Sequence, residues 1–140
     1  MDMQLTEEQA AIDTSVRQIC AEFSDQYWTD CEEESRFPIE YYRRMAEGGW
    51  LGITMPEEVG GAGLGVTEAA IMMHAATSSN GGYSAASAIH INLFGPHSIV
   101  VHGTPEQKSN CGRILAATDQ LLGEFLAEKS LLPAKPPAKS

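Results

Sequence analysis

The chain has 140 residues, of which 43% are hydrophobic and 20% are charged. This composition is typical of one globular domain and excludes a disordered chain. The formal net charge of −10 argues against nucleic acid as a partner, because an acidic surface repels a phosphate backbone. No apolar run approaches the ~20 residues that a membrane-spanning helix needs, so we expect no membrane span.

Cysteine usage and the N-terminal residues bear on the cellular compartment. The three cysteines, Cys20, Cys31 and Cys111, are odd in number and show no Cys-x-x-Cys spacing. They favour reduced thiols over a disulfide framework or a zinc site. Residues 1–6 resemble neither a secretory signal nor an Arg-rich transit segment. We therefore expect an intracellular protein, in the cytoplasm or the mitochondrial matrix.

The first predicted helix begins with a capping box. Thr6 is a good N-cap, and Gln9 stands where the reciprocal side chain is needed. Apolar residues then recur at steps of four, three and four, which makes one helical stripe: Ile12, Val16, Ile19 and Phe23.

An acidic segment follows at residues 25–34. Its carboxylates could be taken for a cation site, and they are Asp30, Glu32, Glu33 and Glu34. No glycine-punctuated calcium-loop spacing surrounds them, so the pattern favours a solvated loop or a helix end.

A second helix is predicted from Pro38, which suits a first helical position. The glycine pair Gly48 and Gly49 supplies its left-handed stop. Its inward stripe consists of Ile39, Tyr42, Met45 and Ala46. The apolar residues 50–53 are too few to assign.

Residues 56–65 form a glycine-rich loop, which has two interpretations. A phosphate cradle would need either a Gly-Lys-Ser/Thr ending or Gly-x-Gly-x-x-Gly spacing. The nearest fit, Gly61 with Gly63, needs a third glycine where Val66 stands. The pattern therefore favours a tight turn that lets helices pack closely.

Glycine and proline residues divide the remainder into helical stretches. The segment Thr104 to Gln107 is a strong helix start, with proline at the first position. The predicted helices cover residues 66–79, 84–94 and 104–117, with a short helical piece at 99–102 and a further helical stretch at 120–132. The whole pattern predicts an all-α fold, a bundle of five to six helices.

No residue pattern specifies an enzyme. The histidines His74, His90, His97 and His102 lack metal-ligand spacing, and Gly-x-Ser-x-Gly is absent. We therefore assign no catalytic residue and no metal site.

The order of several segments nevertheless resembles a known family, the acyl-CoA dehydrogenases, in their N-terminal helical domain. The resemblance covers residues 3–117. It is carried by Thr6–Gln9, Gly49–Ile53, Pro56–Gly65, Thr67–Phe94 and Gly103–Lys108. It implies a helical domain over residues 1–118, followed by a divergent helical extension at 119–132 and a Lys/Pro tail at 133–140.

The resemblance also implies a chemistry. Family members oxidise the Cα–Cβ bond of an acyl-CoA with FAD, and an electron-transfer flavoprotein reoxidises the flavin. A middle β domain and a C-terminal helical domain supply most of the flavin site and the catalytic base. Their Thr-Glu-Pro segment never follows Lys108 here. We therefore expect a truncated chain that is inactive alone and does not retain FAD, and its cofactor-binding residues stay unknown.

In the family, the helix before the Gly-Thr-Pro-Glu-Gln-Lys start lines the acyl-chain pocket. The matching positions here are Ala86, Ser87, His90 and Phe94, at steps that share one helical face. A histidine and a bulky ring predict a preference for short, branched or polar acyl groups. The alternative is that His90 and Phe94 are ordinary core residues.

A domain separated from its neighbours would expose apolar helix faces. The candidates are Met72, Met73, Ile89, Leu93 and Phe94, and they predict self-association. Two other roles stay open: a non-enzymatic helical module that binds a partner, and a vestigial fragment without a function.

Overall fold

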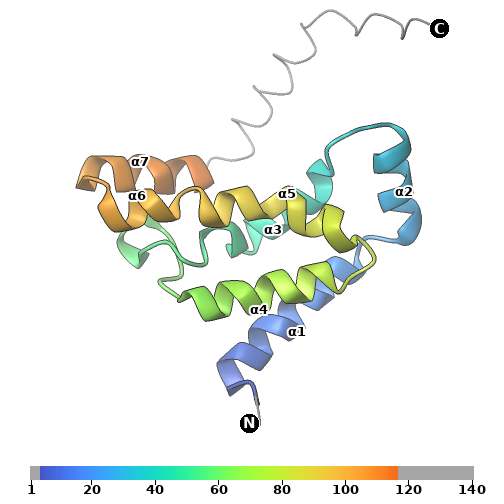
Figure 1. Cartoon of the computed structure of the whole chain (residues 1–140), viewed down its shortest axis with the longest axis horizontal. Coiled ribbons are helices and arrows are strands. Elements are labelled where there is room, and N and C mark those ends of the chain that lie inside the picture. Colours follow the sequence, from blue (N-terminus) through green and yellow to red (C-terminus); the bar gives the residue numbers. More distant parts are fainter. Residues whose placement is uncertain (1–3, 117–140) are drawn as a thin grey trace, which may run out of the picture.

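The computed structural model describes residues 4–116, and all of their regular structure is helical (Figure 1). No strand occurs in this range, so the predicted all-α fold is confirmed. The α-helices are α1 (Glu7–Ala21), α2 (Asp25–Glu33), α3 (Ile39–Glu47), α4 (Val66–Thr77), α5 (Gly82–Phe94), α6 (His97–His102) and α7 (Pro105–Ala116). Two 3-10 turns, η1 (Trp50–Gly52) and η2 (Glu57–Val59), lie between α3 and α4.

The centre of the fold is a layer in which α4 packs against α1 on one side and against α5 on the other. Small buried side chains line these contacts and let the backbones approach closely: Ala69, Ala75, Ala76, Ala85 and Ala88. Larger side chains such as Val16, Met72 and Ile89 fill the space between them and are fully buried.

The predicted capping box at the start of α1 is confirmed, and its Gln9 side chain has a further hydrogen-bond partner in α4. The Thr6 hydroxyl accepts a hydrogen bond from the Gln9 N–H at 3.2 Å, and the Gln9 side-chain oxygen accepts one from the Thr6 N–H at 3.1 Å. The Gln9 amide nitrogen also donates to Glu68 at 3.0 Å, and Glu68 accepts from the Gly65 N–H at 3.1 Å. The first turns of α1 and α4 are therefore joined by one chain of hydrogen bonds.

The acidic segment at residues 25–34 forms a helix of its own, and its four carboxylates lie at the end of that helix, as one of the two interpretations predicted. The helix itself, α2, was not predicted separately. Its N-cap is Ser24, whose hydroxyl accepts from the Tyr27 N–H at 3.3 Å, and it buries Trp28 and Cys31. Its apolar side chains do not recur as a long stripe. Two adjacent aromatic residues, Tyr27 and Trp28, instead pack on the Phe23 ring at centroid distances of 4.9 and 6.4 Å.

An aromatic cluster holds α2 against α3. The Tyr41 ring lies 5.1 Å from the Trp28 ring and 5.5 Å from the Phe23 ring, between ring centroids. The Tyr27 hydroxyl accepts from the Tyr41 N–H at 3.3 Å and donates to the Glu40 carboxylate at 2.9 Å. Tyr41 is the third residue of α3, so this hydroxyl satisfies a helix-start N–H that no N-cap side chain reaches.

The left-handed stop predicted after α3 is found at Gly49, while Gly48 keeps a right-handed backbone with φ of −73°. Gly49 ends the segment after α3 with φ of 76°, and Gly60 and Gly63 also adopt left-handed backbone. A side chain at Gly61 would place its Cβ 2.1 Å from the Met55 carbonyl oxygen. The N–H groups of residues 61–64 donate to carbonyls of residues 52–56, so they are used within the turn. The loop is a tight turn and offers no cradle for phosphate.

The last described helices follow α5 along one edge of the molecule (Figure 1). The predicted start of α7 is confirmed, because Thr104 and Gln107 form a reciprocal pair at 2.8 and 3.2 Å. Among the residues described, no helix is long and apolar enough to cross a membrane. The predicted extension at 119–132 and the tail at 133–140 lie outside the described residues.

The predicted exposed apolar face needs a correction. Met72, Ile89 and Leu93 are buried, with exposed fractions of 0–2%, because they form the contacts of α4 and α5 with the core. Met73 is half-buried, and only Phe94 of the predicted set is exposed, at 58%. The exposed apolar surface is therefore made by other residues.

Candidate functional site

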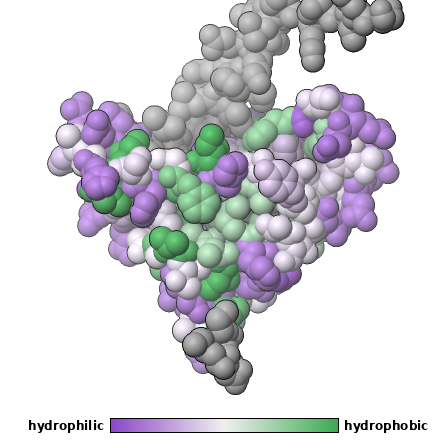
Figure 2. Space-filling view, viewed as in Figure 1, coloured by the Kyte–Doolittle hydropathy of each residue, from purple (hydrophilic) through white to green (hydrophobic). Residues whose placement is uncertain are grey.

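The outer side of α5 exposes a mixed row of aromatic and polar side chains. Tyr83, Ser87, His90 and Phe94 recur at steps of four, three and four, and all are exposed. The exposed fraction reaches 81% for Tyr83. In Figure 2, apolar side chains gather over the middle of the face in view, where α4 and α5 run across the molecule. We call this row of four residues the α5 outer row.

Three of the four predicted pocket residues lie in the α5 outer row: Ser87, His90 and Phe94. The fourth, Ala86, is only 8% exposed and lies beside the row. Tyr83 extends the row toward the start of the helix, and the sequence prediction did not include it. The spacing of Tyr83 from Ser87 could have identified it, since it continues the same period.

His90 is held in one orientation by its own helix. Its Nδ1 lies 2.9 Å from the carbonyl oxygen of Ser87, one turn earlier. The helix itself, residues 82–94, contains no acidic and no other basic side chain. The row therefore combines a phenol ring, a phenyl ring, a serine hydroxyl and an oriented imidazole.

A groove adjoins one end of this row. It lies between α2, the α2–α3 connection and the first turns of α5, with a volume of about 540 Å³. Ser87 and Tyr83 line it on one side, and Trp28, Arg36 and Phe37 line it elsewhere. No sequence pattern indicated this groove, because it depends on how the α2–α3 connection lies against a distant helix.

The charge of Arg36 is already compensated within the groove wall. Its guanidinium lies 2.9 Å from Glu34 and 3.0 Å from Glu40. Burial would raise the pKa of Glu40, but hydrogen bonds from its own backbone, Tyr27 and Arg36 outweigh this and hold the pKa below its usual value. Arg36 is therefore a poor site for an anionic ligand.

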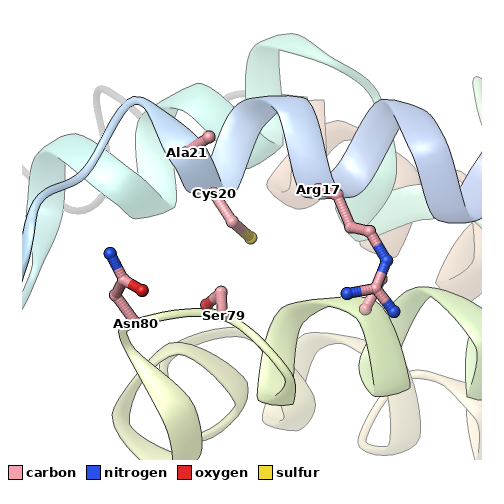
Figure 3. Close-up of a pocket in the computed structure, with 6 residues that line it drawn as sticks. Arg17, Cys20, Ala21, Ser79 and Asn80 are labelled. Carbon is pink, nitrogen blue, oxygen red and sulfur yellow. The ribbon is translucent and has the colours of Figure 1, made fainter.

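A second hollow, of about 240 Å³, lies between α1 and the α4–α5 turn (Figure 3). The labelled side chains of Cys20, Ser79 and Asn80 point into it from the two elements. Burial raises the pKa of the Cys20 thiol, and contacts with Ser79 and Tyr41 offset only part of the effect. The Arg17 guanidinium is bound to Asp13 at 2.7 Å. A protonated thiol and a paired cation make this hollow a weak candidate for chemistry.

No group of three or more metal-ligating side chains converges within residues 4–110, for which side chains are described. His74, His90, His97 and His102 are all exposed, and they lie on three helices.

Comparison with known proteins agrees with this architecture. The family model described as the acyl-CoA dehydrogenase N-terminal domain matches residues 6–118. Acryloyl-CoA reductase (NADH) of Anaerotignum propionicum is 37% identical over 110 residues, which are 77% of this chain and 27% of that protein. An acyl-CoA dehydrogenase of Bacillus subtilis is 27% identical over 126 residues, 90% of this chain and 33% of that protein.

Isobutyryl-CoA dehydrogenase of Dictyostelium discoideum, a mitochondrial protein by its name, is 29% identical over 124 residues, 89% of this chain and 29% of that protein. No solved structure matches the chain. The chain spans about a third or less of the length of these relatives. The matched residues include every described helix, and the chain therefore belongs to the acyl-CoA dehydrogenase family, of which it carries the N-terminal domain.

Proposed function

We propose that this chain is the N-terminal domain of a flavin-dependent acyl-CoA dehydrogenase, and that the α5 outer row forms one wall of the acyl-chain pocket. One observation carries the proposal. Phe94 and Tyr83 are 58% and 81% exposed on a helix whose opposite side is fully packed. Large exposed rings in a row mark a surface that a ligand or a neighbouring domain covers. With His90 and Phe94 in that wall, the site favours short, branched or polar acyl groups.

The redox chemistry would be the flavin's, and neither the glycine-rich turn nor three of the arginines fit the pyrophosphate of a flavin. FAD carries a pyrophosphate, which needs free backbone N–H groups or unpaired cations. The N–H groups of the glycine-rich turn are used internally, and Arg17, Arg36 and Arg44 are each paired with carboxylates. We therefore propose that FAD binds parts of the enzyme outside this chain, and that this chain alone is inactive and does not retain FAD.

The direction of the reaction is not decided by this domain. One relative is named as a reductase that uses NADH, and others are named as dehydrogenases. A pocket wall that binds the acyl chain would bind it in the same way for oxidation and for reduction of the thioester. Acyl-CoA is thus the proposed ligand, with an electron-transfer flavoprotein as partner in the oxidising direction.

Binding of a thioester to the 140-residue chain tests the proposal. Butyryl-CoA and free CoA are titrated into the chain and followed by amide NMR shifts. We expect butyryl-CoA to shift α5 resonances and CoA to leave them unchanged. Phe94→Asp should weaken butyryl-CoA binding about tenfold or more, since it places a charge in the apolar wall.

The matched control is Leu5→Asp, which changes a 48% exposed apolar residue ahead of α1, at the N-terminal end of the molecule (Figure 1). It should leave binding intact. Butyryl-CoA that binds no better than CoA, or equal losses in both variants, would refute the proposed pocket wall. Retention of yellow FAD by the desalted chain would refute the cofactor proposal.

The exposed row also supports self-association of the isolated chain. Phe94 and the neighbouring Ile91, which is 66% exposed, give α5 an uncovered apolar edge. We expect the sedimentation coefficient of the chain to rise with concentration and Phe94→Asp to abolish the rise. A wild-type chain that stays monomeric at high concentration would contradict this.

A further inference from the structure

The hydrogen bond of His90 determines which ring nitrogen is free. The Ser87 carbonyl oxygen can only accept, so the hydrogen of a neutral His90 ring must be on Nδ1, which lies 2.9 Å away. The other nitrogen, Nε2, then keeps its lone pair and acts as a hydrogen-bond acceptor. Among the residues whose side chains are described, none hydrogen-bonds to it.

The position of this acceptor is the centre of the α5 outer row. Phe94 lies one turn further along the helix and Ser87 one turn back, and all three side chains are exposed. A ligand that covers the row therefore covers the imidazole. An acyl chain without a polar group would remove water from Nε2 and leave it unpaired, which is unfavourable.

We propose that His90 Nε2 accepts a hydrogen bond from a hydroxyl group on the acyl chain, so that the site selects hydroxylated acyl thioesters over unsubstituted ones of the same length. The inference rests on the proposed function, because it takes the α5 outer row as the acyl-binding wall. It adds the substrate class and makes His90 the residue that determines it.

The chemistry favours a hydroxyl over a carboxylate. A carboxylate needs a donor, and the only N–H of the neutral ring already points to the Ser87 carbonyl oxygen. The formal net charge of −10 also opposes a negative charge on the acyl group in addition to those of the CoA phosphates. A hydroxyl hydrogen, by contrast, matches the free lone pair directly.

The expected preference is modest. One hydrogen bond between neutral groups that replaces contacts with water favours the hydroxylated ligand by roughly twofold to tenfold. This range is measurable when the two ligands differ only in the hydroxyl group.

The first measurement is the tautomer of His90 in the 140-residue chain, from long-range ¹H–¹⁵N correlations of the imidazole. We expect hydrogen on Nδ1 and a bare Nε2. The opposite tautomer would overturn the proposal, since Nε2 would then be a donor.

The second measurement compares butyryl-CoA with 3-hydroxybutyryl-CoA and 4-hydroxybutyryl-CoA. We expect at least one hydroxylated thioester to bind roughly twofold to tenfold more tightly. His90→Phe, which keeps a ring and removes the acceptor, should abolish the preference. His74→Phe, at an exposed histidine on α4, is the matched control and should preserve it.

The outcomes separate the two proposals. Equal binding of the three thioesters, or a preference that survives in His90→Phe, would overturn the role of His90 and leave the acyl-binding wall standing. A chain that binds none of the three would overturn the proposed function and this inference with it.

Discussion

The two sides of α5 carry similar residues and have opposite environments. Ile89 is completely buried, whereas Ile91, two residues later, is 66% exposed. The helix contacts α4, α3 and η1, whereas the side chains of the α5 outer row are exposed. One helix thus stabilises the domain on its inner side and, in our proposal, binds ligand on its outer side. Because both sides of α5 carry an isoleucine, the two sides differ in the exposure of their side chains and not in residue type.

The largest expected effect is a difference in stability between two variants, in each of which an isoleucine on one side of α5 is replaced by alanine. Ile89→Ala should lower the free energy of unfolding by about 2–5 kcal/mol, because it leaves a cavity in the core. Ile91→Ala should change it by only about 0.5 kcal/mol or less. Urea unfolding followed by circular dichroism measures both values. Similar losses in the two variants would contradict the assignment of inner and outer sides.

A second effect tests the packing of side chains against the start of α5. Gly81 immediately precedes α5, and a Cβ there would lie 2.4 Å from the Trp28 ring. Gly81→Ala should therefore cost about 1–3 kcal/mol in the free energy of unfolding, since the indole must move within a packed core.

The control for Gly81→Ala is Gly52→Ala, where the added Cβ meets its nearest neighbour at an ordinary 3.5 Å. Its effect on the free energy of unfolding should be no larger than about 1 kcal/mol in either direction. If both substitutions are equally mild, the Trp28 side chain does not pack against the start of α5 as described.

A third effect compares two tyrosine hydroxyls. Tyr27→Phe removes the group that accepts the Tyr41 N–H at the start of α3, and should cost about 1 kcal/mol, as the loss of a helix cap does. Tyr83→Phe, on the outer side of α5, should have an effect below about 0.5 kcal/mol. Thermal unfolding of the two variants side by side measures the difference. A larger loss in Tyr83→Phe would reverse the comparison.

The smallest effect is a dependence of stability on pH, which arises at Glu40 near the start of α3. The pKa of Glu40 is held below its usual value of 4.5 in the folded chain. Its contribution to stability is therefore complete above pH 4.5 and is lost as the pH falls through the lowered, folded-state pKa.

Unfolding in urea at a series of pH values from 6 downward tests this dependence. Glu40→Gln should lose less stability on acidification than the unmodified chain, and Tyr83→Phe should lose as much as the unmodified chain. Parallel curves for all three would mean that Glu40 contributes no acid-sensitive interaction.

Much of the fold could be predicted because helix ends are coded locally. Thr6 with Gln9 and Thr104 with Gln107 each place cap and partner within one turn, so the starts of α1 and α7 could be predicted from adjacent residues. The glycines that follow α3 and α4 in the sequence predict the ends of these helices to within two residues of the observed ends.

The inner and outer sides of α4 and α5 could not be predicted in the same way. Apolar residues occur all around both helices, so their periodicity does not point to one buried side. Ile89 was therefore expected on an exposed face although it is buried. The cap that Tyr27 provides to α3 and the groove beside α5 depend on contacts between separate elements, which a local pattern does not contain.

The hydrogen-bond chain from Gln9 to Glu68 has a consequence for the synthesis of the protein. The two residues are 59 positions apart, so α1 leaves the ribosome well before the helix that covers it. At a synthesis rate of about 5–20 residues per second, roughly 3–12 s pass between the synthesis of the apolar stripe of α1 and the synthesis of α4. During that interval the nascent helix is a target for chaperones, and substitutions that weaken its pairing with α4 should reduce the yield of folded protein more than they reduce its final stability.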